Sequence, residues 1–108
     1  MKFSEYQKLS RKTALYDEFY SITYPALGLA GETGEVIDMI KKYIRHDYDI
    51  LDEGPLQAIE KELGDVLWYI ANLATDLGLD LDIVAEKNIQ KLKDRWERKV
   101  IKGNGDER

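Results

Sequence analysis

Apolar residues recur every three or four positions along most of this chain, which is the spacing of one helix face. Ser4 with Gln7 resembles a capping box at the start of the first such segment, and Gly78 is a plausible stop for the third. We therefore predict an all-α fold, a four-helix bundle with antiparallel neighbours. The predicted helices run from Ser4 to about Leu15, from Pro25 to about Arg45, from about Leu56 to about Leu77, and from Asp80 or Asp82 to about Lys99.

The connections between these helices are short. An aromatic-rich loop spans residues 16–24, and an acidic loop spans residues 46–55. We predict one domain over residues 1–102, followed by a tail, residues 103–108, that has no periodic signal. No apolar run approaches the length of a membrane span, and the N-terminus lacks a signal-peptide pattern. We therefore expect a cytoplasmic protein that does not bind membranes.

The predicted third helix carries two adjacent stripes of different character. The apolar stripe consists of Ile59, Leu63, Val66, Ile70, Leu73 and Leu77, and the polar stripe of Glu62, Asp65, Tyr69, Asn72 and Asp76. The opposite side has small residues around Trp68 and no charge. Such a helix is expected to be buried on two sides, and a second subunit is the simplest covering. We therefore expect a homodimer or a homotetramer.

Two pairs of carboxylates lie beside the apolar stripes of the second and third helices. Glu32 and Glu35 form one i, i+3 pair, and Glu62 and Asp65 form the other, so each pair projects from one helix face. If the two helices are antiparallel neighbours, the four carboxylates converge. Repulsion would then protonate some of them unless cations are bound. Oxygen ligands of this kind favour Mg²⁺, with Mn²⁺ as a substitute.

Other polar positions add to the hypothesis of a Mg²⁺ site. The predicted fourth helix places Asn88, Lys91 and Arg95 on its inner face, which is costly unless that face lines a polar cavity. Lys91 and Arg95 are candidates to bind phosphate oxygens. Tyr69 is either a substrate contact or a ring at the edge of the core. Within the second helix, Gly31 and Gly34 predict the close approach of a backbone or a ligand.

Composition narrows the chemistry further. The chain has 21 acidic and 16 basic residues and a net charge of −5, which argues against a general binder of nucleic-acid polymers. It has no Cys and one His, which excludes thiolate sites, disulfides and a His-based zinc site. Without a Cys or His nucleophile, direct attack by water is the default for any hydrolysis.

With these motifs in order, the chain resembles the MazG-like, all-α nucleoside triphosphate pyrophosphohydrolases. The resemblance lies in Gly28-Leu-Ala-Gly-Glu-Thr-Gly-Glu35, Glu62-Leu-Gly-Asp-Val-Leu-Trp-Tyr69 and Asn88-Ile-Gln-Lys-Leu-Lys-Asp-Arg95. It implies a MazG-like bundle completed by oligomerisation. It also implies hydrolysis of a nucleoside triphosphate to the monophosphate and pyrophosphate, with a nucleotide-pool house-cleaning role.

The resemblance also implies roles for the residues. Glu32, Glu35, Glu62 and Asp65 would bind Mg²⁺, while Asn88, Lys91, Arg95 and Tyr69 would contact the substrate. Glu35 and Glu62 are our candidates for catalysis, with Glu35 the first choice for activating water. Two kinds of alternative stay open. One is a dUTP- or dCTP-specific enzyme or a phosphoribosyl-ATP pyrophosphohydrolase, and the other is a helical interaction module without activity.

Overall fold

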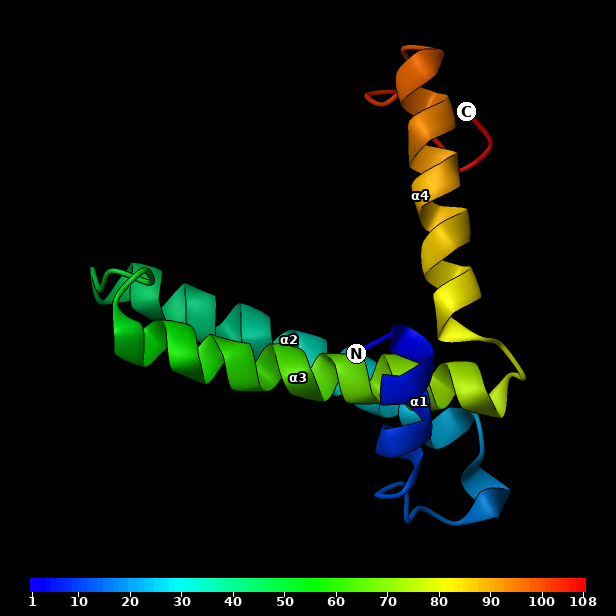
Figure 1. The fold of residues 1–108 in the computed structure, drawn as a ribbon. Helices are drawn as coiled ribbons and strands as arrows, with labels where there is room; N and C mark the ends of the chain where they lie inside the picture. Colours follow the sequence, from blue (N-terminus) through cyan, green and yellow to red (C-terminus); the bar gives the residue numbers. More distant parts are fainter.

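The protein is built from four α-helices and one short 3₁₀ helix, with no β-strand, in a computed structural model that describes residues 1–108 (Figure 1). The predicted all-α fold with four helices is therefore confirmed. The elements are α1 (Phe3–Arg11), η1 (Glu18–Tyr20), α2 (Thr23–Arg45), α3 (Glu53–Asp76) and α4 (Leu81–Glu97). No helix is both long and apolar enough to cross a membrane.

Helices α2 and α3 form a long antiparallel hairpin, α1 packs across α3, and α4 rises away from the hairpin (Figure 1). The predicted stop of α3 at Gly78 is confirmed. Gly78 has φ +71°, a left-handed conformation that favours glycine, and its N–H donates to the Thr75 carbonyl. Of the two predicted caps of α4, it is Asp80 that serves, by accepting a hydrogen bond from the N–H of Asp82 at 2.8 Å.

The predicted capping box of Ser4 and Gln7 is wrong. Helix α1 begins one residue earlier, and the Gln7 side chain instead joins α1 to the α3–α4 connection. Its amide group donates to the Leu79 carbonyl at 2.8 Å, and its amide oxygen accepts from the Leu81 N–H at 2.9 Å. The N–H of Ser4 donates to Asp82 at 3.2 Å. The first turns of α1 and α4 meet here, so polar groups near the start of α1 form hydrogen bonds with the start of α4 and the residues before it.

Part of the uncharged side of α3 is covered by α1 of the same chain. Ala71 is completely buried there and joins Ala74 and Leu81 in the small core. The Trp68 indole donates to the Thr13 hydroxyl at 2.8 Å. The first helix therefore covers the part of this face around Ala71 that the sequence assigned to a second subunit, whereas Gly64 on the same face is exposed. The homodimer or homotetramer stays a prediction. Sequence periodicity shows that a face is buried, but it does not show by which element.

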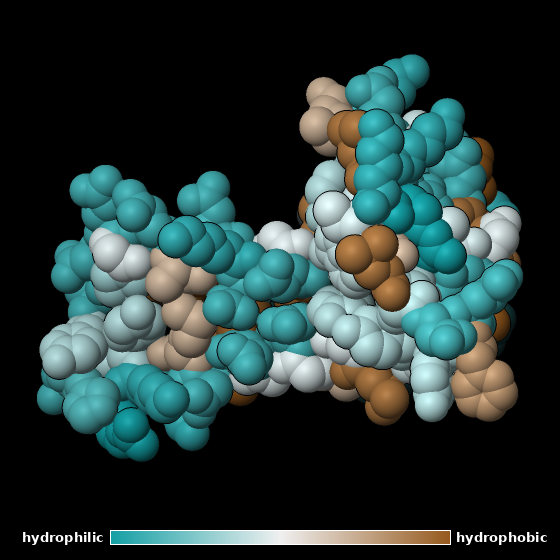
Figure 2. Space-filling view, turned by 90° about the horizontal axis from the view of Figure 1, so that it is seen from below, coloured by the Kyte–Doolittle hydropathy of each residue, from teal (hydrophilic) through white to brown (hydrophobic).

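Other apolar faces are left open. The chain buries only 7 of its 108 residues, and its radius of gyration is 16.7 Å, against about 13 Å for a compact domain of this length. Figure 2 shows apolar side chains at the surface of both the hairpin and the remainder of the chain. Members of the predicted apolar stripes that are exposed include Ile37, Ile44, Leu63, Leu77, Val84 and Leu92.

The loop between α1 and α2 is anchored by Asp76, at the end of α3. The Asp76 carboxylate is buried, pairs with Arg11 at 2.8 Å, and accepts hydrogen bonds from the Tyr16 hydroxyl at 2.8 Å and the Ile22 N–H at 2.9 Å. Ile22 has φ +69°, a strained conformation for a β-branched residue. Burial alone would raise the pKa of Asp76, but these hydrogen bonds outweigh it and hold the pKa below its usual value.

We expect Asp76→Asn to destabilise the fold by about 2 kcal/mol at pH 7, because it removes charge-assisted hydrogen bonds to a buried group. Because the pKa of Asp76 is lower in the folded state, its ionisation stabilises the fold at any pH above the unfolded pKa of about 3.9. This contribution is lost as the pH falls through the pKa of the folded state. Urea unfolding should therefore show the full difference from wild type at pH 7, and this difference should shrink as the pH is lowered below about 3.9. Asp94→Asn, which affects an exposed pair with Arg98, is the control and should change stability little.

Candidate functional site

Three carboxylates meet where α2 and α3 lie side by side. One oxygen each from Glu32, Glu35 and Glu62 lies within 4.8 Å of the others. Glu32 and Glu35 share a face of α2 because they are three residues apart, and the antiparallel hairpin places Glu62 of α3 opposite them. Asp65, one turn along α3, is near enough to act electrostatically on Glu32. The structure thus brings Glu62 to two carboxylates that lie at least 27 positions before it in the sequence.

These carboxylates affect one another's titration. Partial burial raises the pKa of Glu32 above its usual value, and the negative charges of Asp65, Glu35 and Glu62 and a hydrogen bond with Glu62 raise it further. The cluster therefore gains a proton more readily than isolated glutamates do, and a bound cation would relieve the same repulsion. Its donors are all oxygens, without a neighbouring thiolate or imidazole, so the set fits a hard divalent cation such as Mg²⁺.

Tyr69 lies next to this cluster and packs on Gly28 of α2. A Cβ atom at Gly28 would lie 2.1 Å from the Tyr69 ring, so only glycine leaves room for this ring. Burial raises the pKa of Tyr69, and a hydrogen bond with Tyr24 and the charges of Glu32 and Asp65 raise it further. The Tyr69 ring therefore separates the carboxylates from the aromatic residues at the start of α2.

The prediction of a close approach at Gly31 and Gly34 is not met within the chain. Apart from the adjacent residues and the helix's own backbone, no heavy atom lies within 4 Å of a Cβ at either position, and the close contact falls instead at Gly28. The pattern of glycines indicated a helix edge with room for a neighbour. It could not show which glycine the neighbouring ring would use.

We expect Gly28→Ala to displace the Tyr69 ring and to destabilise the fold by about 1–3 kcal/mol, as overpacking does. The matched control is Gly31→Ala, which enters open space one turn along the same helix. It should stabilise the fold by up to about 1 kcal/mol through helix propensity. Urea unfolding and near-ultraviolet circular dichroism would measure both variants. Equal effects of the two substitutions would contradict the assigned position of Tyr69.

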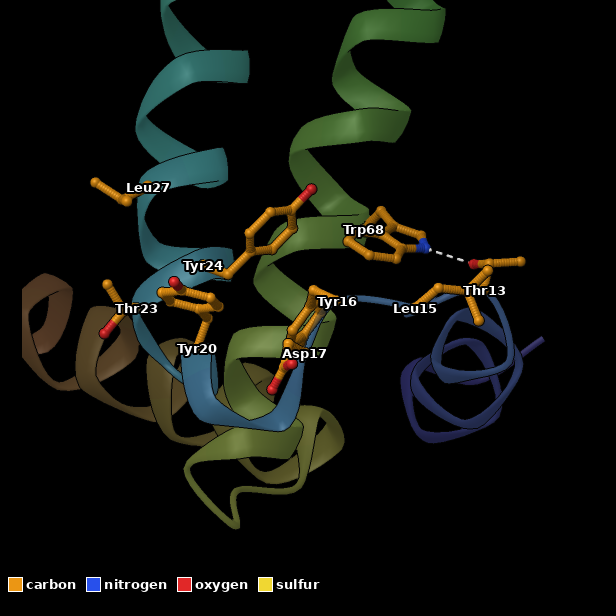
Figure 3. A pocket seen from close by; sticks show the side chains of 9 residues that line it. All are labelled: Thr13, Leu15, Tyr16, Asp17, Tyr20, Thr23, Tyr24, Leu27 and Trp68. Atoms are coloured by element: carbon orange, nitrogen blue, oxygen red, sulfur yellow. Dashed lines mark hydrogen bonds between the residues drawn. The ribbon is translucent and has the colours of Figure 1, made fainter.

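An aromatic pocket of about 650 Å³ opens between the start of α2 and α3 (Figure 3). The Tyr16 and Tyr24 rings are stacked with centroids 4.8 Å apart, and Trp68 lies at another wall. The lining residues are Thr13, Leu15, Tyr16, Asp17, Tyr20, Thr23, Tyr24, Leu27 and Trp68. From the sequence, residues 16–24 are recognisable only as a loop, and the four aromatic residues in this loop are the one signal of a pocket.

The candidate substrate residues of α4 do not join the carboxylates of the same chain. Helix α4 packs on α1 and then leaves the hairpin (Figure 1). Asn88 and Lys91 line a groove of about 410 Å³ on α4 itself. Lys91 and Arg95 both form ion pairs with Asp106, in the tail that follows α4. The structure therefore contains two separate groups of polar residues, one acidic on the hairpin and one basic on α4.

Asn72 and Trp68, from the polar and uncharged sides of α3, have structural partners. The buried Asn72 amide donates to the Trp68 carbonyl at 3.0 Å, and its oxygen accepts from Arg11 at 3.4 Å. Both residues thus help to hold α1 and its loop on α3. Trp68 keeps part of its ring in the aromatic pocket.

Comparison with known proteins gives a family whose matched region contains the acidic cluster. The family model of the MazG nucleotide pyrophosphohydrolase domain matches residues 22–100, which include both carboxylate pairs and the polar face of α4. The gene 37 protein of Mycobacterium phage L5 is 37% identical over 109 residues, covering 95% of this chain and 96% of that protein. No solved structure matches the chain. On the family match and the acidic cluster that lies within it, the chain belongs to the MazG nucleotide pyrophosphohydrolase family.

Proposed function

We propose that the protein hydrolyses ribo- or deoxyribonucleoside triphosphates to the monophosphate and pyrophosphate, in a Mg²⁺-dependent reaction that serves nucleotide-pool house-cleaning. The observation that carries this proposal is the convergence of Glu32, Glu35 and Glu62 within 4.8 Å, inside a region that matches the MazG family. The fit of an all-oxygen donor set to a hard cation supports Mg²⁺.

The carboxylates have distinct roles in this proposal. Glu32, Glu35, Glu62 and Asp65 hold Mg²⁺, which when bound would neutralise phosphate charge and polarise the α-phosphoryl group. Glu35 accepts a proton from the attacking water, and Glu62 helps to orient that water. A bond forms between the water oxygen and the α-phosphorus, the α–β anhydride bond breaks, and pyrophosphate leaves. No covalent step on the protein is required.

The aromatic pocket is the best candidate to receive the base. Stacking on aromatic rings is worth about 1–3 kcal/mol per base and tolerates different bases. Tyr24 lies in this pocket, and its ring is 6.3 Å from that of Tyr69, which is next to Glu32. A nucleotide with its base in the pocket would thus direct its phosphates past Tyr69 toward the carboxylates, which gives Tyr69 a substrate contact.

The open surface supports a dimer in solution. The chain exposes 8316 Å², whereas a compact monomer of its mass exposes about 6,200 Å². The excess of about 2,000 Å² is the area that each subunit buries in a large, obligate interface. A second copy would cover the exposed apolar faces of α2, α3 and α4. It would also bring the α4 face of Asn88, Lys91 and Arg95 to a substrate held at the carboxylates, where the exposed Lys91 contacts phosphate oxygens. The α4 of the same chain does not approach these carboxylates.

A panel of ribo- and deoxyribonucleoside triphosphates, assayed for pyrophosphate release with Mg²⁺, tests the proposal. We expect release from several triphosphates and none when EDTA replaces Mg²⁺. One dominant substrate would favour the base-specific alternatives, and phosphoribosyl-ATP belongs in the panel for the same reason. Release of orthophosphate alone, or no release from any nucleotide, would contradict the proposed reaction.

Thermal melting separates an enzyme from an interaction module. At about 100 times its Kd, Mg²⁺ should stabilise the fold by about 2.7 kcal/mol, or a melting temperature shift of about 10 °C. The raised pKa of Glu32 means that the metal-free fold loses stability as the pH rises through this pKa and regains it on acidification. The Mg²⁺-induced shift should therefore be larger at pH 8 than at pH 5. The same ionic strength of NaCl is the control, and equal shifts from both salts would contradict a metal site.

A further inference from the structure

The tail of residues 103–108 folds back onto α4 and binds both of its candidate phosphate-binding cations. One oxygen of Asp106 lies 3.0 Å from the Lys91 ammonium and 2.8 Å from a terminal nitrogen of Arg95. The same Arg95 nitrogen also donates to the main-chain carbonyl of Asp106. Both cations hold the pKa of Asp106 below its usual value, Arg95 by the stronger hydrogen bond. Asp106 thus joins two residues that lie one turn apart on α4.

The position of Asp106 is fixed by contacts that do not involve Lys91 or Arg95. The Arg108 guanidinium donates to the carbonyls of Val100 at 3.1 Å and Ile101 at 3.2 Å, and also to that of Gly105. Arg98, the residue that follows α4, donates in turn to the main-chain carbonyl of Arg108 at 2.7 Å. A cation near the C-terminal end of a helix is favoured by the helix dipole. The tail is therefore a small ordered cap that places one carboxylate beside α4.

Asp106 does not balance the charge of its two partners, Lys91 and Arg95, and this local imbalance leaves room for an anion. One carboxylate faces two cations, so a net positive charge remains. Arg95 is only 5% exposed, and its Nε has no hydrogen-bond partner. The Lys91 side chain is 42% exposed and can donate further hydrogen bonds to a ligand. Asp106 thus offsets the cost of a buried guanidinium while leaving Lys91 able to bind an anion.

We propose that Asp106 is a positioning residue for substrate binding: it holds Arg95 and Lys91 together so that Lys91 binds the triphosphate. This inference rests on the proposed function, in which Lys91 contacts phosphate oxygens. A different role is that the Asp106 carboxylate occupies the place of a phosphate and must be displaced. The geometry favours positioning, since a triphosphate would reach the buried Arg95 only after the cap held by Arg108 had opened.

Steady-state kinetics of Asp106→Asn and Asp106→Glu test the proposal at saturating Mg²⁺. Asp106→Asn should raise the KM for the best triphosphate about tenfold, the loss of one charge-assisted hydrogen bond, with little change in kcat. Asp106→Glu, which restores the charge, should recover most of the loss. Glu107→Gln changes the adjacent charge, which forms no ion pair, and should match wild type in both constants.

Binding of inorganic tripolyphosphate, measured by calorimetry, gives a second readout that does not need turnover. Asp106→Asn should weaken it about as much as it raises the KM. A lower KM or tighter binding in Asp106→Asn would overturn positioning in favour of displacement. The positioning role would also be overturned if Asp106→Asn lowered kcat and the melting temperature while it raised the KM, as general damage to the fold would do. No change in any of these quantities would overturn it as well. If wild type releases no pyrophosphate, the proposed function fails, while the tripolyphosphate measurement still decides the role of Asp106.

Discussion

The double variant Glu62→Gln/Asp65→Asn should release pyrophosphate at least about a thousandfold more slowly than wild type. Its helical circular dichroism should be unchanged. Both residues lie on α3 opposite Glu32, whose pKa responds to each of them. Neutral amides remove two of the four negative charges that would hold Mg²⁺, and amide groups cannot replace them electrostatically. The expected loss is large because metal binding and the activation of water depend on the same residues.

The same double variant should be more stable than wild type in the absence of metal. Its two amides relieve the repulsion that raises the pKa of Glu32. The Mg²⁺-induced rise in melting temperature should disappear. Glu60→Gln, an exposed change two residues from Glu62 on α3, is the control and should keep both activity and the Mg²⁺ shift. Unchanged activity in the double variant would remove these carboxylates from the site.

Sequence periodicity predicted what depends on local spacing. The four helices, the Asp80 cap and the Gly78 stop follow from neighbouring residues, and the structure confirms them, except that the first helix ends at Arg11 and not near Leu15. The meeting of Glu32, Glu35 and Glu62 was predicted as well, because i, i+3 spacing and an antiparallel hairpin leave little freedom. The roles assigned to these carboxylates remain predictions.

The contacts that the sequence did not reveal are those between distant segments. Gln7 has the spacing of a capping residue, but its amide reaches the start of α4. Asp76 lies in the polar stripe of α3 with Glu62, yet it holds the strained Ile22 of the aromatic loop. The tail has no periodicity, and its order depends on side-chain bonds from Arg108 to carbonyls. Local spacing does not encode such partners, because each depends on how two elements pack.

The separation of the two polar groups leads to a complementation experiment. The Lys91→Ala variant and the Glu62→Gln/Asp65→Asn variant should each be inactive, but a mixture refolded together should recover about a quarter of wild-type activity. In a two-fold symmetric dimer, each site would combine the hairpin of one subunit with α4 of the other. A mixed dimer then has one site with both defects and one site with none. Random assembly gives half mixed dimers, and half of their sites are intact.

The outcome depends on whether α4 contributes Lys91 to the carboxylates of its own chain or to those of the other subunit. The experiment therefore tests the arrangement of the two subunits as well as the roles of the substituted residues. If Lys91 acted on the carboxylates of its own chain, every site in a mixed dimer would carry one defect and no activity would return. A variant with all three substitutions, mixed with the carboxylate variant, is the matched control and should stay inactive. Light scattering of the wild type shows whether the dimer exists at the assay concentration. The structural reason to expect recovery is that α4, which carries Lys91, extends away from the α2–α3 hairpin, which carries Glu62, in the single chain (Figure 1).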